Sequence, residues 1–341
     1  MRHEGKRGAE LAILIDEKTS VAIQGITGRE GSARTRTMLD FGTNVMCGVT
    51  PGRGGTKVWD LPVYNTLMEA VEKHGPIDAS VTFVPGPDVK DAVLEAIECG
   101  VKFIVVPAER VPLHDSLKMI ASAREKGIKI LGPGSLGLIS ANKALMGWIG
   151  GTEEMAREVF KPGSVGVISR SGGQTTTVTW SIMSAGLGVT TAMHVGAEPV
   201  LGLCFAELLP LFEKDEETKA VVLFGEIGTV AEEEAAEVVR EGRFTKPLVT
   251  YISGRSLPKG IRFSHASAII EGGRGTAESK ILALQSVGAY IADKPQDIAK
   301  ILLQVLGGGD DTEVDALYTC EQFEIGKQGG GTSHGCYHSG S

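Results

Sequence analysis

Short β-branched runs alternate with helical patterns along most of this 341-residue chain. The first unit is the apolar run 21–25, which ends in glycine and leads into a helical pattern at 32–41. Further strands are expected at 44–50, 78–84, 102–106 and 129–131, with helices at 66–74, 89–98 and 115–126. Strands that alternate with helices in this way form βαβ units, so the pattern predicts an α/β fold with parallel sheets.

The alternation breaks at residues 142–163 and then starts again. The break contains paired glycines, a charged helical piece at 153–159 and a Lys-Pro-Gly turn. A second series of strands is expected at 164–168, 189–195, 220–224 and 245–252. The length suits two domains of ordinary size. We therefore expect a leader (1–20), a first domain (21–150), a linker (151–163), a second domain (164–306) and a low-complexity, flexible tail (307–341).

Composition narrows the class of protein. The net charge of −8 argues against a nucleic-acid binder. The five cysteines are scattered without a C-x-x-C pair, which indicates neither a disulfide framework nor a zinc site, and we expect no metal site. No apolar run is long enough to span a bilayer, and the N-terminus lacks the apolar core of a signal peptide. We expect a cytoplasmic protein with no membrane contact.

Glycines follow the first strand at positions 25, 28 and 31, immediately before a helix. Such glycines permit positive φ and let a phosphate approach the free amides of the helix N-terminus. The spacing G-x-x-G-x-x-G differs from the dinucleotide G-x-G-x-x-G, and a plain tight turn remains the alternative. Arg53 lies in a second glycine loop, where its guanidinium suits a phosphate. A solvated loop charge is the alternative there.

Three features of the second half carry candidate chemistry. Ser171, Gly172 and Gly173 precede a helix and could form an amide nest for an anion. Glu226 follows a strand, either as a helix-start charge or as a carboxylate that orients a histidine. His265 stands among small residues, where a neutral imidazole can act as a nucleophile or an acid–base group. A loop histidine satisfied by backbone is the alternative.

Six motifs occur in an order that resembles a known family. They are Gly25-Ile-Thr-Gly-Arg-Glu-Gly31, Gly48-Val-Thr-Pro-Gly-Arg-Gly-Gly55, Leu61-Pro-Val-Tyr-Asn-Thr66, Ser169-Arg-Ser-Gly172, Gly225-Glu-Ile-Gly228, and Pro258-Lys-Gly followed by His265-Ala and Ala-Ile-Ile270. Over about residues 12–306 the chain resembles the α subunit of succinyl-CoA synthetase and its relatives. These acyl-CoA synthetases form ADP or GDP through a phosphohistidine.

The resemblance implies a Rossmann-like CoA-binding domain followed by a flavodoxin-like ligase domain. It implies that His265 is the phosphorylated histidine and Glu226 its carboxylate partner. It also implies an ATP-grasp β subunit, absent from this chain, that holds ATP and Mg²⁺ in a hetero-oligomer. The residues implied to contact CoA are Gly28, Arg29, Glu30, Gly31, Arg53, Pro107, Ala108, Glu109 and Ser135. Those implied to bind the acid or phosphate are Ser171, Gly172 and Gly173.

Differences between this sequence and the motifs of the succinate enzymes indicate which acid is the substrate. Where those enzymes have G-P-N-C-P-G, this chain has Gly132-Pro-Gly-Ser-Leu-Gly137. The doubled glycine at 172–173 resembles the citrate-contacting turn of ATP-citrate lyase, and it leaves room for a larger acid. The chain most resembles small subunits of citryl-CoA synthetases, which make citryl-CoA, ADP and phosphate from citrate, CoA and ATP in the tricarboxylic acid cycle.

Alternative functions remain open at this point. The acid could be succinate or malate instead of citrate. In another class, the chain could be a CoA-binding regulatory protein without catalysis, although such a protein needs neither His265 nor Glu226. An NAD-dependent dehydrogenase is disfavoured by the glycine spacing and by Thr50-Pro51, because no acidic residue closes the second strand.

Overall fold

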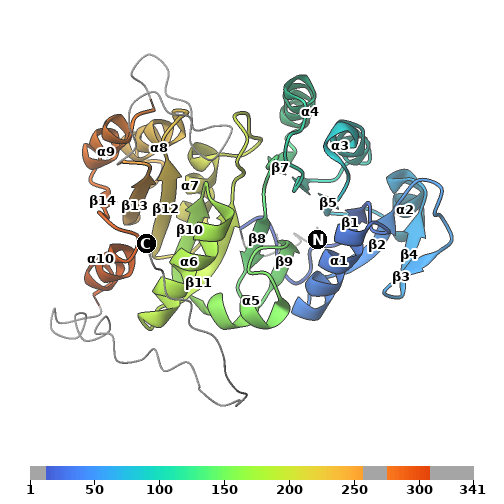
Figure 1. Ribbon diagram of the computed structural model, residues 1–341, viewed down its shortest axis with the longest axis horizontal. Coiled ribbons are helices and arrows are strands. Elements are labelled where there is room, and N and C mark those ends of the chain that lie inside the picture. Colours follow the sequence, from blue (N-terminus) through green and yellow to red (C-terminus); the bar gives the residue numbers. More distant parts are fainter. Residues whose placement is uncertain (1–12, 256–274, 308–341) are drawn as a thin grey trace, which may run out of the picture.

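The structure, a computed structural model, describes residues 13–255 and 275–307. Within them, two α/β units lie side by side, one made by the first half of the chain and one by the second (Figure 1). His265 and most of the expected tail lie outside the described residues. Among the described residues, no helix combines the length and the apolar character needed to cross a lipid bilayer.

The first sheet contains seven strands in the order β3-β4-β2-β1-β5-β6-β7. Its strands are β1 (Val21–Gln24), β2 (Val45–Val49), β3 (Lys57–Val58), β4 (Leu61–Tyr64), β5 (Ala79–Thr82), β6 (Phe103–Val105) and β7 (Lys129–Leu131). The helices are α1 (Arg29–Phe41), α2 (Leu67–His74), α3 (Val89–Glu98) and α4 (Leu113–Glu125), with a short 3₁₀ turn, η1 (Gly86–Asp88). Every residue of β1, β5 and β6 is buried, as expected for parallel strands covered on both faces.

Strand order reverses next to β1. From β1 the chain proceeds to β2 and β4 on one side, then returns to β5, β6 and β7 on the other. In open α/β sheets, ligands bind outside the carboxyl ends of the strands at such a switch point. The segments that follow β1 and β5 are therefore the expected walls of a binding site.

The second sheet has the order β14-β13-β12-β10-β11-β8-β9. Its strands are β8 (Gly137–Ser140), β9 (Ala144–Gly147), β10 (Pro162–Ser169), β11 (Val189–His194), β12 (Ala220–Glu226), β13 (Leu248–Ser253) and β14 (Tyr290–Ile291). The helices are α5 (Glu153–Val159), α6 (Gly172–Ser184), α7 (Phe205–Lys214), α8 (Ala231–Arg240), α9 (Ala277–Gln285) and α10 (Asp297–Val305). The order around β10 is that of flavodoxin-like sheets, and the switch point lies between β10 and β12.

The predicted fold class is confirmed, with local exceptions to parallel pairing. Strand β3 is antiparallel to β4, and β8 is antiparallel to both β11 and β9. The expected first domain, 21–150, includes β8 and β9, but these strands extend the second sheet. The change of sheet therefore falls between β7 and β8, because β8 finds its hydrogen-bonding partner in β11.

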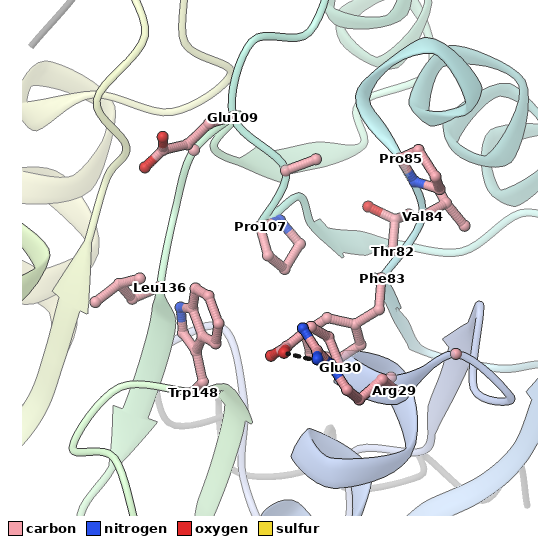
Figure 2. A pocket seen from close by; sticks show the side chains of 14 residues that line it. Arg29, Glu30, Thr82, Phe83, Val84, Pro85, Pro107, Glu109, Leu136 and Trp148 are labelled. Carbon is pink, nitrogen blue, oxygen red and sulfur yellow. Dashed lines mark ion pairs between the residues drawn. The ribbon is translucent and has the colours of Figure 1, made fainter.

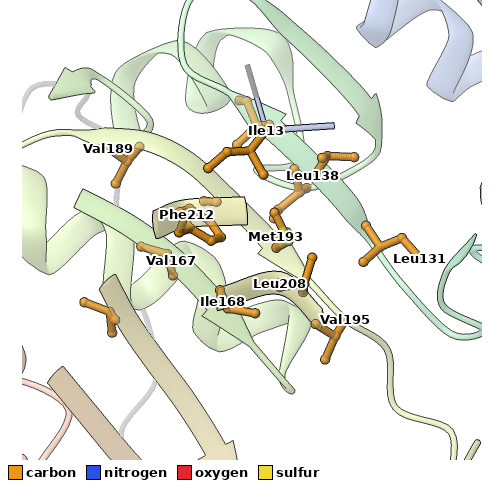
Figure 3. Packing of buried hydrophobic residues seen from close by; sticks show 14 of the residues in the cluster. Ile13, Leu131, Leu138, Val167, Ile168, Val189, Met193, Val195, Leu208 and Phe212 are labelled. Carbon is orange, nitrogen blue, oxygen red and sulfur yellow. The ribbon is translucent and has the colours of Figure 1, made fainter. Parts of the chain in front are cut away.

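One hydrophobic cluster runs through both units. Leu131 of the first sheet belongs to it, together with Ile13, with Leu138 and Met193 of the second sheet and with Phe212 of helix α7 (Figure 3). Each fully buried side chain of this kind contributes roughly 1.5–3 kcal/mol. The Thr43 hydroxyl also donates to the carbonyl oxygen of Leu145 across the boundary, at 2.7 Å. The two units are thus packed together, which fixes the walls of the space between them.

Candidate active site

A cavity of about 650 Å³ lies between the two units (Figure 2). Three walls come from the first unit: the turn after β1 with the start of α1, the segment after β5, and the segment after β6. A fourth wall comes from the loop before β8 and from Trp148, which directly follows β9. The lining residues are Gly28, Arg29, Glu30, Gly31, Thr82, Phe83, Val84, Pro85, Pro107, Ala108, Glu109, Gly134, Leu136 and Trp148. The cavity therefore lies at the switch point of the first sheet.

Glycines shape the wall at α1. Gly25 has φ +83°, and a Cβ there would lie 2.3 Å from the carbonyl oxygen of Phe83. A Cβ on Gly31 would lie 2.2 Å from the carbonyl oxygen of Gly25. Gly28 caps α1 without a side-chain hydrogen bond, so the first amides of the helix remain available at the cavity. Free amides and the positive end of the helix dipole suit a phosphate group.

A second cavity of about 600 Å³ adjoins the first. The two share Gly28 and the segment 83–85 in their linings, and the second extends to Thr50 and Pro51 after β2. Its outer wall carries three carboxylates, from Asp88, Asp91 and Glu95. Together the cavities follow the carboxyl edge of the first sheet and can accommodate a long ligand.

The structure brings together most of the first-half residues that the sequence singled out. Positions 28–31 and 107–109 line the same cavity. Arg53 lines neither large cavity and lies in an exposed loop whose shape depends on Asn65, which accepts from the amides of Gly52 and Gly54. Ser135 is fully buried behind the cavity wall, and its hydroxyl donates to the His194 carbonyl and accepts from the Gly137 amide.

Sequence reasoning did not identify the walls contributed by residues 82–85, Leu136 and Trp148. A signal for 82–85 was present, because the segment follows a strand at the switch point and continues into Pro-Gly-Pro. Trp148 offered no such signal. It enters the wall because β9 joins the second sheet, and the Arg34 guanidinium lies over its ring at 4.3 Å.

A second group of candidate residues gathers at the switch point of the second sheet. Arg170 directly follows β10, and Glu226 is the last residue of the neighbouring strand β12. Both are buried, with Arg170 at 2% and Glu226 at 9% exposure, and their Nε and Oε1 atoms lie 3.5 Å apart. Ser171 is the N-cap of α6 and makes no side-chain cap bond. The first amides of α6 thus stand beside a buried ion pair.

The two glycines at the start of α6 have different surroundings. A Cβ on Gly172 would lie 2.3 Å from Leu136 Cδ1, so packing requires glycine there. A Cβ on Gly173 would meet no heavy atom within 4 Å, so this position faces open space. Leu136 lines the large cavity and contacts α6, so it connects the two candidate sites.

His194, at the end of β11, ties these segments together. The Leu136 amide donates to His194 Nδ1 at 3.0 Å, and Nε2 lies 3.1 Å from the Arg170 carbonyl oxygen. This pattern assigns the neutral tautomer with the proton on Nε2, because Nδ1 accepts while the carbonyl needs a donor. His194 is 3% exposed and serves as a structural link between the loop 132–137 and the start of α6.

Charged groups also hold the backbone at the end of β12 and just after it. The Glu226 amide donates to Glu232 Oε1 at 3.0 Å. Glu232 pairs with Lys280, whose Nζ also donates to the Gly228 carbonyl oxygen at 2.8 Å. The side chains of both Glu232 and Lys280 are buried. Within the described ranges, no cluster of three or more His, Cys, Asp or Glu side chains could hold a metal ion.

Comparison with known proteins finds two family models along the chain. Residues 16–110 match the CoA binding domain, and residues 168–290 match the CoA-ligase model. The chain is 47% identical to the ADP-forming sulfoacetate-CoA ligase subunit SqwL of an Acholeplasma species, over 86% of this chain and 97% of that protein. It is 46% identical to the succinate–CoA ligase [ADP-forming] subunit alpha 2 of Archaeoglobus fulgidus, over 87% of this chain and all of that protein.

Among solved structures, two ATP citrate lyases have a similar fold over most of this chain. An ATP citrate lyase from Methanosaeta concilii, in complex with (3S)-citryl-CoA, superposes with a TM-score of 0.80 at 26% identity over 87% of this chain. An ATP citrate lyase from Methanothrix soehngenii, in complex with citrate and coenzyme A, gives the same values. This chain spans 51% of each of those lyase chains, about half their length.

Proposed function

Because this chain belongs to the family of α subunits of ADP-forming acid–CoA ligases, we propose that it joins a small acid to CoA together with a separate ATP-binding subunit. The observation that carries the proposal is the pair of switch-point sites on adjoining units. One has the shape and free amides for CoA, and the other has buried charges beside a helix N-terminus.

CoA binds along the carboxyl edge of the first sheet in this proposal. The amides at the start of α1 receive its phosphates, and the segment 107–109 lines the path of the pantetheine arm. Support comes from the match to the CoA binding domain and from the position of these residues around one cavity. Leu136 and Trp148 line the cavity on the side of the second unit, where this proposal places the thiol.

The chemistry uses His265 as a temporary phosphate carrier. A ring nitrogen of His265 attacks the γ-phosphorus of ATP, and ADP leaves. A carboxylate oxygen of the acid then takes the phosphoryl group, which frees the imidazole and forms an acyl phosphate. The CoA thiolate attacks the acyl carbon, and phosphate leaves. Glu226 accepts from the other ring N–H of His265, and the amides at 172–173 stabilise the phosphoryl oxygens.

The nucleotide belongs to a partner in this scheme. The family resemblance implies an ATP-grasp β subunit that carries ATP and Mg²⁺. The working enzyme is then a hetero-oligomer. The relatives named as subunits alpha of ADP-forming ligases support this division of labour.

Citrate is the acid that we propose. Gly173 faces open space at the start of α6, where a third carboxylate needs room, and the two similar lyase structures hold citryl-CoA or citrate with CoA. Sulfoacetate is the second candidate, because the 47% identical relative is a sulfoacetate-CoA ligase subunit. Both acids carry a further anionic group beside the carboxylate that is activated.

Thioester formation by the co-expressed pair of subunits tests the proposal. Citrate, sulfoacetate, succinate and malate are each supplied with ATP, Mg²⁺ and CoA, and kcat/KM is compared. We expect the highest kcat/KM for citrate and no product from His265→Asn. A higher kcat/KM for another acid would change only the proposed substrate and would leave the proposed reaction in place. CoA binding without thioester from any acid would favour a regulatory CoA-binding protein.

A further inference from the structure

Arg170 is a buried cation that the proposed chemistry does not use. It follows β10 and precedes Ser171, the N-cap of α6. Its side chain is 2% exposed, and its Nε lies 3.5 Å from Glu226 Oε1. Within the described part of the chain, Nε and Nη2 have no hydrogen-bond partner. Nε therefore interacts with Glu226 Oε1 as a charge at 3.5 Å.

A guanidinium in this position constrains the ionisation of its neighbour. Arginine stays protonated in proteins, so its burial requires a compensating anion nearby. Glu226 can compensate only when its carboxyl group is ionised. A carboxylate is also the form that accepts an N–H from an imidazole. Arg170 thus favours the state of Glu226 that a histidine needs.

The charged groups on the neighbouring helices α8 and α9 pair mainly with one another. Helix α8 contributes Glu232 and Glu233, and α9 contributes Lys280, which pairs with Glu232 and lies 3.8 Å from Glu233 Oε2. Glu234 of α8 lies near the same charges, and burial with these neighbouring carboxylates raises its pKa. Lys280 thus lies against Glu232 and Glu233, whereas Arg170 lies against Glu226. His194, from β11, adds no charge in its neutral tautomer and contacts the carbonyl oxygen of Arg170.

We propose that Arg170 is a positioning residue that keeps the carboxylate of Glu226 ionised and fixed at the end of β12. The inference rests on the proposed function, in which Glu226 orients the phosphorylated histidine. Arg170 acts on the carboxylate, whereas Glu232 and Lys280 hold the backbone of the same segment. Arg170 touches neither substrate nor phosphoryl group in this role.

The pH profile of phosphorylation from ATP distinguishes this role from a purely structural one. Rates are measured on the complex with its partner subunit for wild type, Arg170→Gln and Arg170→Lys. The acidic limb of the pH–rate profile, where the rate falls as the pH is lowered, is expected to lie about one pH unit higher in Arg170→Gln. The reason is that a carboxylate that loses a nearby cation protonates more easily. Arg170→Lys retains a cation, so its limb stays close to that of wild type.

Two further variants complete the test. Lys246→Met removes another partly buried cation of the same unit, one that donates to the carbonyl oxygens of Phe212 and Asp215. This variant is expected to lower the melting temperature without shifting the acidic limb of the pH–rate profile. In a Glu226→Gln background, Arg170→Gln is expected to cause no further loss of rate, because the residue through which it acts is already neutral.

The outcomes separate this inference from the proposed function. No phosphorylation of the wild-type complex would overturn the proposed function and this inference with it. If the wild-type complex is phosphorylated but the acidic limb of the pH–rate profile is unchanged in Arg170→Gln, this inference alone is overturned. The inference would also be overturned if Arg170→Gln lowered the phosphorylation rate equally in the wild-type and Glu226→Gln backgrounds.

Discussion

Replacing Lys280 with methionine is expected to be among the most destabilising single changes in the second unit. Lys280 is fully buried in α9, where it pairs with Glu232 of α8 and donates to the Gly228 carbonyl oxygen at 2.8 Å. Methionine retains most of the side-chain length and apolar contact but removes the charge. The variant therefore leaves Glu232, with 1% side-chain exposure, as a buried carboxylate without its cation.

The size of the effect follows from this burial. Removing one partner of a buried ion pair typically costs about 3–5 kcal/mol, because the remaining charge is neither solvated nor compensated. Typical domains have only about 5–15 kcal/mol of stability, so the loss is a large fraction of the total. As a matched control, Lys143→Met breaks the exposed pair with Glu217, whose side chains are 32% and 62% exposed. That change is expected to cost at most about 1 kcal/mol.

Urea denaturation followed by circular dichroism measures both variants. The double variant Lys280→Met/Glu232→Gln is expected to recover at least part of the loss, because it no longer buries an unpaired charge. Equal stability losses for Lys280→Met and Lys143→Met would refute the reasoning. So would a double variant that is less stable than Lys280→Met alone, because the penalty would then lie in packing and not in charge.

Three other changes test different parts of the account. Ala108→Trp fills the cavity between the units and is expected to raise KM for CoA about tenfold or more at unchanged melting temperature, as initial rates at varied CoA would show. Gly173→Leu adds a side chain where nothing lies within 4 Å, so the fold is expected to persist while kcat/KM for citrate falls more than for smaller acids. Burial acts to raise the pKa of Glu213, but hydrogen bonds from the amide and hydroxyl of Thr245 outweigh it and hold this pKa below its ordinary value of 4.5. This carboxylate therefore stabilises the fold above about pH 4.5, and the difference in melting temperature between wild type and Glu213→Gln is expected to vanish as the pH falls below that value.

Local sequence patterns predicted much of the element order. The helix at 89–98 and the strand at 129–131 have the predicted bounds, because each is a clear apolar pattern with a breaker after it. The short β3–β4 hairpin was missed. Its turn residues, Trp59 and Asp60, adopt positive φ without a glycine to signal it.

Long-range pairing could not be predicted in the same way. Nothing within 137–147 indicates that β8 pairs with β11 rather than with the first sheet, because the partner lies about fifty residues away in the chain. Trp148 enters the cavity wall as a consequence of that pairing. The Ser169-Arg-Ser-Gly motif was recognised, but the role proposed for its arginine rests on the burial of that side chain beside Glu226, which the sequence does not show.

The transfer of phosphate through His265 is the central claim, and the most direct measurement follows a label on the complete complex. The complex is incubated with ATP labelled at the γ-phosphate, the labelled peptide is located by mass spectrometry, and citrate with CoA is then added. The account predicts an acid-labile, base-stable phosphate on His265 that disappears as thioester forms. Label on another residue of this chain, or label on His265 that survives the addition of acid and CoA, would contradict it.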